Sequence, residues 1–294
     1  MKIRPSALAG AWYPSDPRDL KLSVESYIAW GSRLPSCSPP CQGGEGGGSH
    51  SAALRGLVLP HAGHKYSGQT CGAGVALARG KNFSKVILIG PSHRMFVRGA
   101  VSSGATHFET PLGTVPVDLA SVRRLAAAGV FCSDDPHQRE HCLEILLPFF
   151  QSALKEFQIV PILVGSLSDS DRGRLVEALR EVSDDRTLVV ASSDFVHYGD
   201  DFDYVPEVGP DVRAGVRKID EGAIDYIRAL DPKGLLEYRR LTGATICGIV
   251  PIAVLLDCLP EKSHVEFIDY SQSADVTQDT NHMVSYASIA FFSP

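Results

Sequence analysis

The sequence predicts an α/β fold: a single domain with a mainly parallel central sheet and helices on both faces. Short runs of β-branched and apolar residues, typical of buried strands, alternate with segments of helical periodicity along most of the chain. Several of these runs stop abruptly at polar residues, as strands do at the carboxyl edge of an open α/β sheet. A chain of 294 residues, 44% of them hydrophobic, has enough apolar side chains to form such a core.

Six buried strands are expected, each a short apolar run bounded by turn residues. A hairpin is expected at 99–117, where Thr110-Pro111-Leu112-Gly113 supplies the turn. The six strands lie at 56–59, 85–89, 158–164, 187–191, 265–269 and 284–292.

Helix signals lie between these strands. Asp16 is a suitable N-cap with Pro17 in the first helical turn, and Asp118 is placed to cap a later helix. Apolar periodicity and small-residue content then predict helices at 16–30, 67–78, 118–128 and 168–182, and two or three helices within 210–259 that break near Asp231-Pro232 and at 241–243.

Residues 35–50 are a low-complexity insert rich in Pro, Gly and Ser. Such a composition buries too little apolar surface to offset the entropy of ordering, so we expect a flexible surface loop within a domain that spans 1–294. Cys37 and Cys41 lie in this insert without a second cysteine pair at zinc-ribbon spacing, which argues against a structural zinc ion there. The seven cysteines are scattered along the chain and do not form the dense framework of a small disulfide-rich domain, so we expect reduced thiols.

Charge and hydropathy exclude several classes of protein. The formal net charge of −6 argues against a nucleic-acid-binding protein, which usually has a basic surplus. No apolar run is long enough to span a bilayer. The start of the chain has no apolar core of signal-peptide length, so we expect a cytoplasmic protein.

Polar residues with metal-binding or acid–base chemistry follow three of the predicted strands. His61 follows the first strand, His93 the second, and Asp194 and His197 the fourth. Because the carboxyl ends of parallel strands meet at one edge, these side chains should converge. Two neutral imidazoles suit a transition metal, which then requires a third and preferably anionic ligand. Asp194 is close enough in sequence to orient the ring of His197 for proton transfer.

A further histidine, His141, is expected on a polar loop that enters an apolar segment. Glu144 follows three residues later, so a helix there would place both side chains on one face. Glu144 would then either support the pocket or help to cap a helix.

Six short motifs in order along the chain carry a family resemblance. Together they closely resemble the Memo family, which shares its fold with the class III extradiol dioxygenases of the LigB type; only the insert at 35–50 stands apart. The motifs are Ala9-Gly10-Ala11-Trp12-Tyr13-Pro14, Pro60-His61-Ala62-Gly63, Gly90-Pro91-Ser92-His93, Glu140-His141-Cys142-Leu143-Glu144, Ser192-Ser193-Asp194-Phe195-Val196-His197 and Thr245-Ile246-Cys247-Gly248.

The resemblance implies a dioxygenase-like pocket with one transition metal ion on His61, His93 and Cys247. The related dioxygenases have a carboxylate where Memo proteins have the cysteine. Because a thiolate is softer, iron(II) or copper(I) is expected and zinc is also compatible, and the sulfur is open to oxidation. The alternative is that Cys247 is a small buried thiol on a helix, as Cys71 and Cys258 are expected to be.

The resemblance also suggests roles for the other residues of the pocket. His197 matches the dioxygenase base and His141 the second pocket histidine, with Asp194 orienting His197. Ser92 and Ser193 either donate hydrogen bonds to a bound anion or have structural roles.

Two aromatic residues, Trp12 and Tyr66, are expected to line the pocket, although Trp12 could instead pack the N-terminal arm on the body. The chain differs from the usual Memo pattern at two positions. His64 replaces an aromatic residue, as an outer ligand or part of a polar rim, and Cys142 replaces a serine, which would add an oxidisable thiol if it faces the pocket.

Three functions fit these expectations. The first is metal-dependent redox chemistry on an unknown small molecule by a dioxygenase-like oxidoreductase. The second is a non-enzymatic adaptor that binds phosphotyrosine peptides, because eukaryotic Memo relatives are linked to receptor tyrosine-kinase signalling and cell motility. The third is copper or iron buffering. In bacteria and archaea the family is associated with a radical-SAM partner system.

Overall fold

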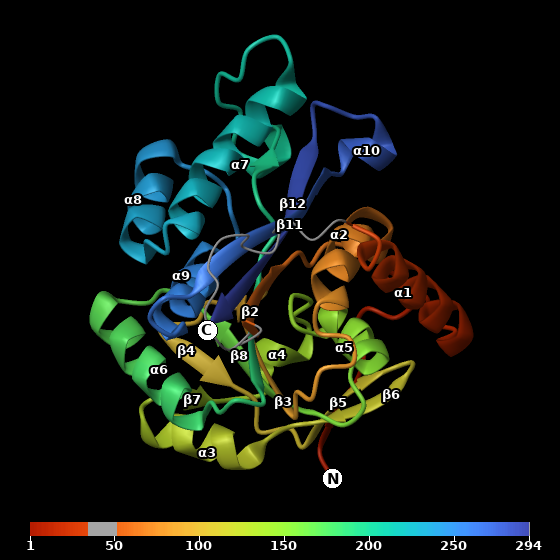
Figure 1. Ribbon diagram of the computed structural model, residues 1–294, viewed down its shortest axis with the longest axis vertical. Coiled ribbons are helices and arrows are strands. Elements are labelled where there is room, and N and C mark those ends of the chain that lie inside the picture. The colour runs from red at the N-terminus through yellow and green to blue at the C-terminus, as the bar shows by residue number, and fades with distance from the viewer. Residues whose placement is uncertain (35–51, 294) are drawn as a thin grey trace, which may run out of the picture.

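The computed structural model describes residues 1–34 and 52–293. The insert predicted at 35–50, with Cys37 and Cys41, lies outside the described residues. The described part of the chain forms one central sheet with helices packed on both sides, as Figure 1 shows. The predicted α/β architecture is therefore confirmed.

The central sheet is mixed, and its middle is parallel. Strands β2, β9, β3 and β8 are neighbours that run parallel, whereas β12 and β4 join the two sides of this block antiparallel. All six strands expected from apolar runs are present. The order across the sheet is β10 (His197–Tyr198), β12 (Met283–Ser293), β2 (Ala53–Leu59), β9 (Thr187–Ser192), β3 (Lys85–Pro91), β8 (Gln158–Val164), β4 (Ala100–Ser102) and β7 (Phe131–Cys132), with β11 (His264–Gln272) paired to β12.

The hairpin expected at 99–117 is shorter than predicted. Its turn at Thr110–Gly113 is correct, but only β5 (His107–Thr110) and β6 (Gly113–Pro116) form it, and β1 (Ile3–Arg4) adds a parallel third strand. The start of the predicted hairpin instead forms β4, whose three residues are all buried and pair with β8. Burial against the core outweighs the local hairpin pattern there.

The helices lie in two layers. In Figure 1 one layer lies on the right of the sheet, and the other lies on the left and below it. Within the described ranges, no helix has both the length and the apolar content needed to cross a bilayer. The first layer is α1 (Pro17–Gly31), α2 (His64–Ala76) and α5 (Leu147–Ala153). The second contains α3 (Leu119–Ala127), α6 (Asp169–Val182) and α9 (Ile249–Cys258), with α8 (Pro232–Thr242) beside α9 and α7 (Val212–Arg228) beside α8.

Capping residues set the starts of two predicted helices, whereas the helix expected at 67–78 is α2, which begins three residues earlier, at His64, without a side-chain cap. Asp16 Oδ1 accepts the backbone N–H of Arg18 at 2.8 Å, and Pro17 occupies the first turn, so α1 begins where expected. α8 begins just after Asp231 and ends at Gly243, whose φ of 68° suits glycine. The remaining short helices are α4 (Asp135–Gln138), α10 (Ala274–Thr277), η1 (Glu144–Leu146) and η2 (Asp200–Phe202).

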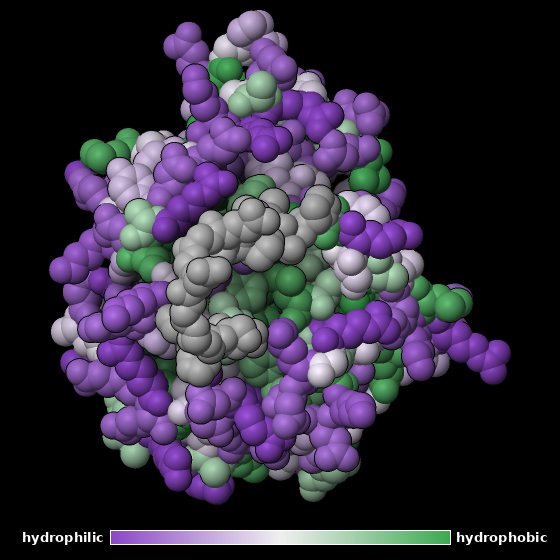
Figure 2. All heavy atoms as spheres, viewed as in Figure 1, coloured by the Kyte–Doolittle hydropathy of each residue, from purple (hydrophilic) through white to green (hydrophobic). Residues whose placement is uncertain are grey.

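The sheet aligns three strand ends at one edge. Leu59 of β2 pairs with Ser192 of β9, and Ile89 of β3 pairs with Ala191 next to it. The loops that follow these strands therefore leave the sheet side by side. Figure 2 shows a largely hydrophilic surface on the face in view, with apolar side chains gathered in a hollow near its centre.

Candidate metal centre

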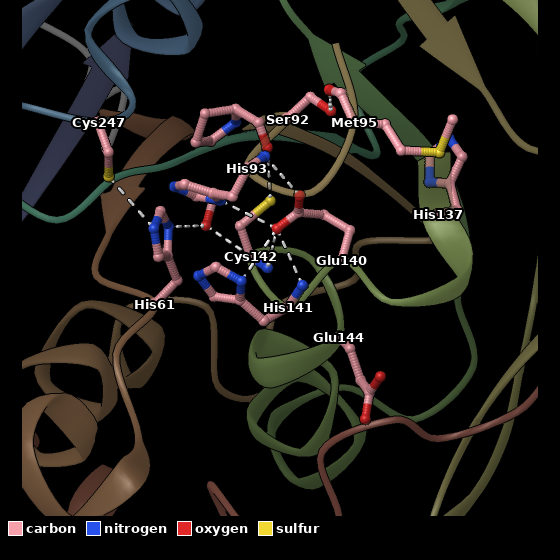
Figure 3. Close-up of polar contacts among 12 residues, drawn as sticks. His61, Ser92, His93, Met95, His137, Glu140, His141, Cys142, Glu144 and Cys247 are labelled. Atoms are coloured by element: carbon pink, nitrogen blue, oxygen red, sulfur yellow. Dashed lines mark hydrogen bonds and ion pairs between the residues drawn. The ribbon is translucent and has the colours of Figure 1, made fainter. Parts of the chain in front are cut away.

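Three side chains that can bind a metal meet beyond the carboxyl edge of the sheet. His61 follows β2, His93 follows β3, and Cys247 lies just before α9. One ligand atom from each lies within 4.8 Å of the other two. In Figure 3 the sulfur of Cys247 points toward the ring of His61, which in turn faces the loop of His93. Segments distant in sequence thus supply two imidazoles and a thiol to one point.

The hydrogen bonds of His61 determine its tautomer. Ser192 Oγ donates its only proton to the carbonyl oxygen of Cys142 at 2.6 Å, so it must accept from His61 Nδ1, 2.8 Å away. Nε2 of His61 is therefore unprotonated, and it faces Cys247 Sγ at 3.2 Å. Burial, with His141 and His93 nearby, also lowers the pKa of His61 well below its ordinary value. The ring is held neutral, with its metal-binding lone pair facing the thiol.

Glu140 orients His93, and sequence reasoning assigned it no role. It is buried, and its carboxylate accepts the backbone N–H of His93 at 2.7 Å and lies 3.0 Å from His93 Nδ1. Burial alone would raise the pKa of Glu140, but the contacts with His141 and His93 outweigh it and hold that pKa well below its ordinary value. A buried carboxylate beside Nδ1 keeps the proton there, which leaves Nε2 of His93 free.

His93, Glu140 and His141 form a second group with metal-ligand spacing. Glu140 Oε1, the oxygen that lies beside His93 Nδ1, also accepts the backbone N–H of His141 at 2.9 Å and that of Cys142 at 3.3 Å. It lies 3.1 Å from His141 Nδ1. An oxygen surrounded by donors has little capacity left for a metal ion. Glu140 therefore fits an orienting role better than a ligand role.

Cys247 is a protonated thiol in the absence of an ion. Burial, together with Asp194, raises the pKa of Cys247 well above its ordinary value. Its sulfur accepts the backbone N–H of Asp194 at 3.3 Å. A metal ion would displace the thiol proton, so binding should release protons. Two neutral imidazoles and one displaceable thiol proton are a donor set that fits a single transition metal ion.

Asp194 does not orient His197, and that part of the sequence interpretation is wrong. Asp194 Oδ1 accepts the backbone N–H of His61 at 2.7 Å, so the carboxylate holds the loop of a candidate ligand. Burial raises the pKa of Asp194 to about 7. His197 Nδ1 instead lies 2.9 Å from the carbonyl oxygen of Phe195 and 3.0 Å from that of Thr245. Because carbonyl oxygens only accept, Nδ1 carries the proton and Nε2 is free.

A cleft of about 600 Å³ opens over His61 and His93, two of the three candidate ligands. His61, His93, His141, Asp194 and His197 all contribute to its lining. Burial lowers the pKa of His141 and of His197 below the ordinary histidine value, so both rings are neutral near pH 7. This is a cleft of small-molecule size with two imidazoles beside a candidate metal position.

Aromatic side chains form much of the rest of the cleft wall. Trp12 lines the cleft and its ring lies 4.6 Å from that of His141, while Tyr66 lines it from α2 and is 37% exposed. Phe202 lies against His197, with ring centroids 5.0 Å apart. The structure therefore places both Trp12 and Tyr66 at the pocket.

Comparison with known proteins agrees with this arrangement. A family model described as Memo-like protein matches residues 4–290. The chain belongs to the Memo family. A MEMO1 family protein of Methanosarcina acetivorans is 32% identical over 98% of this chain and 99% of its own. Human Protein MEMO1 is 28% identical over 97% of this chain and 95% of its own.

A solved structure shares the fold at low sequence identity. An uncharacterized protein of Escherichia coli K12 superposes with a TM-score of 0.52 at 15% identity, over 81% of this chain and 99% of its own. The likeness concerns the fold alone. The Memo family is known to share a dioxygenase-like fold, and this chain has the family's α/β architecture.

Two serines of the Memo motifs lie away from the cleft lining. Ser92 Oγ donates to the carbonyl oxygen of Met95 at 2.7 Å. Ser193 is fully buried; its hydroxyl donates to the carbonyl oxygen of Asp194 and accepts the backbone N–H of Gly248 at 3.0 Å. Both serines hold backbone segments. Of the two roles considered for them, the structural one fits these contacts and hydrogen bonding to a bound anion does not.

Glu144 is a structural residue, and it shares no helix face with His141. The predicted helix is only the short η1, which begins at Glu144 itself, and Figure 3 shows Glu144 pointing away from the histidines. Its carboxylate accepts the hydroxyl proton of Ser6 at 2.9 Å and that of Tyr13 at 2.5 Å, and pairs with Arg4. Glu144 therefore anchors the N-terminal arm and does not cap a helix.

The two residues that depart from the Memo pattern also lie outside the cleft. His64 is buried, and its Nε2 donates to the carbonyl oxygen of Ile145 at 3.0 Å, so it is neither an outer ligand nor part of a rim. Cys142 is fully buried, with its sulfur 3.2 Å from the carbonyl oxygen of Pro91. Cys71 is buried in α2, and Cys258 is half-buried at the end of α9.

Proposed function

We propose that this Memo-family protein is a metal-dependent oxidoreductase that binds one transition metal ion through His61, His93 and Cys247. The observation that carries the proposal is the fixed protonation of the two histidines. Ser192 and Glu140 each hold an Nδ1–H, so the Nε2 atoms of two histidines that line a cleft are left bare, and the thiol of Cys247 lies near these rings. This set of soft and borderline donors suits iron(II) or copper(I), and also zinc.

A redox-active ion held there would supply electron transfer to O₂ or substrate. The chain's own residues would supply the acid–base chemistry. His197, whose proton is held at Nδ1, would use Nε2 to take a proton from a hydroxyl group of the substrate. His141 would hydrogen-bond the same group, and Trp12 and Phe202 would exclude water from it.

Elemental analysis of protein purified without a chelating resin is the first test. The proposal expects one transition metal ion per chain. Protein loaded anaerobically with iron(II) should then consume oxygen in a metal-dependent way, and His197→Ala should lose at least about a hundredfold of that rate while still binding the metal. Equal rates of oxygen consumption in the variant and the wild type would show that His197 takes no part in the chemistry.

The thiolate is tested by exchanging sulfur for oxygen. Cys247→Ser should weaken copper(I) binding far more than iron(II) binding, because copper(I) depends more on the soft ligand. Chelator competition for each ion gives the two affinities. Equal loss of both, or loss of neither, would count against a thiolate ligand.

A second candidate function is binding without turnover. Lys65 and Tyr66 line the same cleft, and the ammonium group of Lys65 lies 5.5 Å from the centroid of the Tyr66 ring. A cation beside aromatic walls suits an aromatic phosphate such as phosphotyrosine. Metal affinity without oxygen use would favour this function or metal buffering, and binding of a phosphotyrosine peptide that Lys65→Ala abolishes would separate those two.

A further inference from the structure

Thr245 makes three hydrogen bonds to His197, through its hydroxyl and its backbone carbonyl. Its hydroxyl accepts the backbone N–H of His197 at 3.0 Å and donates to the backbone carbonyl of His197 at 2.6 Å. Its own carbonyl oxygen accepts the ring Nδ1–H of His197 at 3.0 Å. One residue thus holds both the backbone and the ring of the histidine.

These contacts belong to a longer pairing of two segments. Asp194 N–H donates to Cys247 Sγ at 3.3 Å, and Gly248 N–H donates to Ser193 Oγ at 3.0 Å. The loop after β9 and the segment before α9 are therefore joined at three successive places, from Ser193 to His197. Cys247 is two residues beyond Thr245, so the candidate ligand and the candidate base lie on the same pair of segments.

The other side of the His197 loop is also fixed. The fully buried Asp220 of α7 accepts the backbone N–H of Val196 at 2.9 Å, and Ser285 of β12 exchanges backbone hydrogen bonds with Phe195 and Val196. Within the described residues, the ring itself meets hydrogen-bond acceptors only at the carbonyls of Phe195 and Thr245. Thr245 is the partner that reaches the ring from a different element.

We infer that Thr245 is a positioning residue, which holds His197 in the Nδ1–H tautomer with Nε2 facing the cleft and fixes it relative to Cys247. The inference rests on the proposed role of His197 as base. Loss of the Thr245 hydroxyl leaves the backbone N–H and C=O of His197 without that partner. The two segments then stay joined only between Asp194 and Cys247 and between Ser193 and Gly248, so the Thr245 carbonyl that accepts Nδ1–H is no longer held beside the ring.

Nitrogen NMR of the histidine rings in zinc(II)-loaded protein tests this without a substrate. In the wild-type protein His197 should be one tautomer, protonated at Nδ1. Thr245→Val, which keeps the shape and removes the hydroxyl, should shift the tautomer equilibrium toward Nε2–H by about fivefold or more. Thr245→Ser keeps the hydroxyl and should restore the wild-type spectrum.

Thr242→Val is the matched control. Thr242 is exposed on the same stretch of chain, and its hydroxyl donates to Tyr238 instead of the histidine. Its removal should leave the His197 signals unchanged. An unshifted equilibrium in Thr245→Val, or the same shift in Thr242→Val, would overturn the inference. So would a wild-type His197 protonated at Nε2, a result that needs no variant to fold.

The outcomes separate this inference from the proposed function. A tautomer shift in Thr245→Val, with no oxygen use by iron(II)-loaded wild-type protein, would support Thr245 as a positioning residue and refute the redox proposal. Oxygen use in the wild type with an unchanged tautomer in Thr245→Val would do the reverse. If both hold, oxygen use in Thr245→Val should fall by about tenfold or more, and its pH profile should shift.

Discussion

At the scale of single residues, one carboxylate organises the candidate metal centre. Glu140 binds the backbone and the ring of His93 and the backbone of His141, so it sets the positions of two histidines at once. Its hydrogen-bond partners are donors, mostly N–H groups, which suits a carboxylate because both of its oxygens only accept. The chemistry of His93 thus depends on a residue that does not line the cleft itself.

Glu140→Gln tests that dependence. The amide NH₂ of glutamine would face N–H donors, so the ring of His93 would lose its fixed tautomer. We expect zinc(II) affinity to fall by about 10- to 100-fold in chelator competition. Glu109→Gln, at an exposed position of β5, is the control and should bind as the wild type does. Wild-type affinity in a folded Glu140→Gln protein would contradict the role assigned to the carboxylate.

At the scale of elements, α1 and α2 pack closely because glycines line their contact. A Cβ atom on Gly72 of α2 would lie 2.6 Å from the backbone carbonyl carbon of Tyr27 in α1, closer than real Cβ atoms approach. A Cβ on Gly31 would likewise lie 2.4 Å from the Cα of Ala73. This close packing keeps α2, and with it Tyr66, against the sheet beside the cleft.

Gly72→Ala should therefore destabilise the protein by about 1–3 kcal/mol, because the new methyl group must push the helices apart. Gly173→Ala is the matched control in α6, where nothing lies within 4 Å of an added Cβ. That change should be neutral or stabilising by about 0.4–1 kcal/mol, since alanine restricts the unfolded chain. Urea unfolding measures both, and equal effects would refute the packing argument.

A buried carboxyl group joins α7 to β11 and to the His197 loop. Asp220 accepts from Tyr270 Oη at 2.8 Å as well as from the Val196 N–H. Burial raises the pKa of Asp220 to about 7, above its unfolded value of 3.8. The folded state therefore holds this proton more tightly than the unfolded state does. The contribution to stability is fully present below the unfolded pKa and is lost as the pH rises through about 7.

Asp220→Asn resembles the protonated acid and cannot ionise. Relative to the wild type, the variant should gain about 1–3 kcal/mol of stability between about pH 5 and about pH 8. Asp194 has the same sign of shift, so only the difference between the two proteins isolates Asp220. Asp225→Asn, exposed on the same helix, should change little across this range. Urea titrations at both pH values measure the free energy of unfolding of each protein. If this free energy changes with pH equally in Asp220→Asn and the wild type, ionisation of Asp220 does not affect stability.

At the scale of the whole molecule, the N-terminal arm is joined to the loop that carries the site. Glu144 accepts the backbone N–H of Leu8 at 3.0 Å and the hydroxyl of Tyr13, and its carboxylate is buried against Arg4. Arg4 Nη2 also donates to the carbonyl oxygen of Glu140 at 2.7 Å. These bonds bring Trp12 over the cleft, so one wall of the site depends on the first residues of the chain.

Glu144→Ala should cost about 3–5 kcal/mol, because Arg4 would remain buried without its partner. The N-terminal arm should also become sensitive to limited proteolysis before the rest of the protein unfolds. Glu156→Ala, exposed after α5, is the comparison and should change neither property. An arm that stays protected in a variant of normal stability would show that Glu144 is not its anchor.

The sequence alone determined the order of most elements and indicated where the candidate site lies. Apolar runs and cap residues depend on neighbours in the chain, so strands such as 187–191 and helices such as 168–182 were predicted well. The placement of histidines after parallel strands follows from topology, so the meeting of His61 with His93 was also predictable. The third candidate ligand, Cys247, came from the family resemblance, since no local pattern distinguishes it from a core thiol.

Only the tertiary structure decided which groups hold those side chains. Asp194 is three residues from His197 but bonds His61, 133 residues away, and His197 is held by Thr245, 48 residues away. Glu140 and Glu144 belong to one short motif, yet one faces the histidines and the other anchors Arg4. A hydrogen bond depends on which backbone N–H and C=O groups come within about 3 Å once the layers pack. Those partners are set by the fold of the whole chain, and spacing in the sequence does not report them.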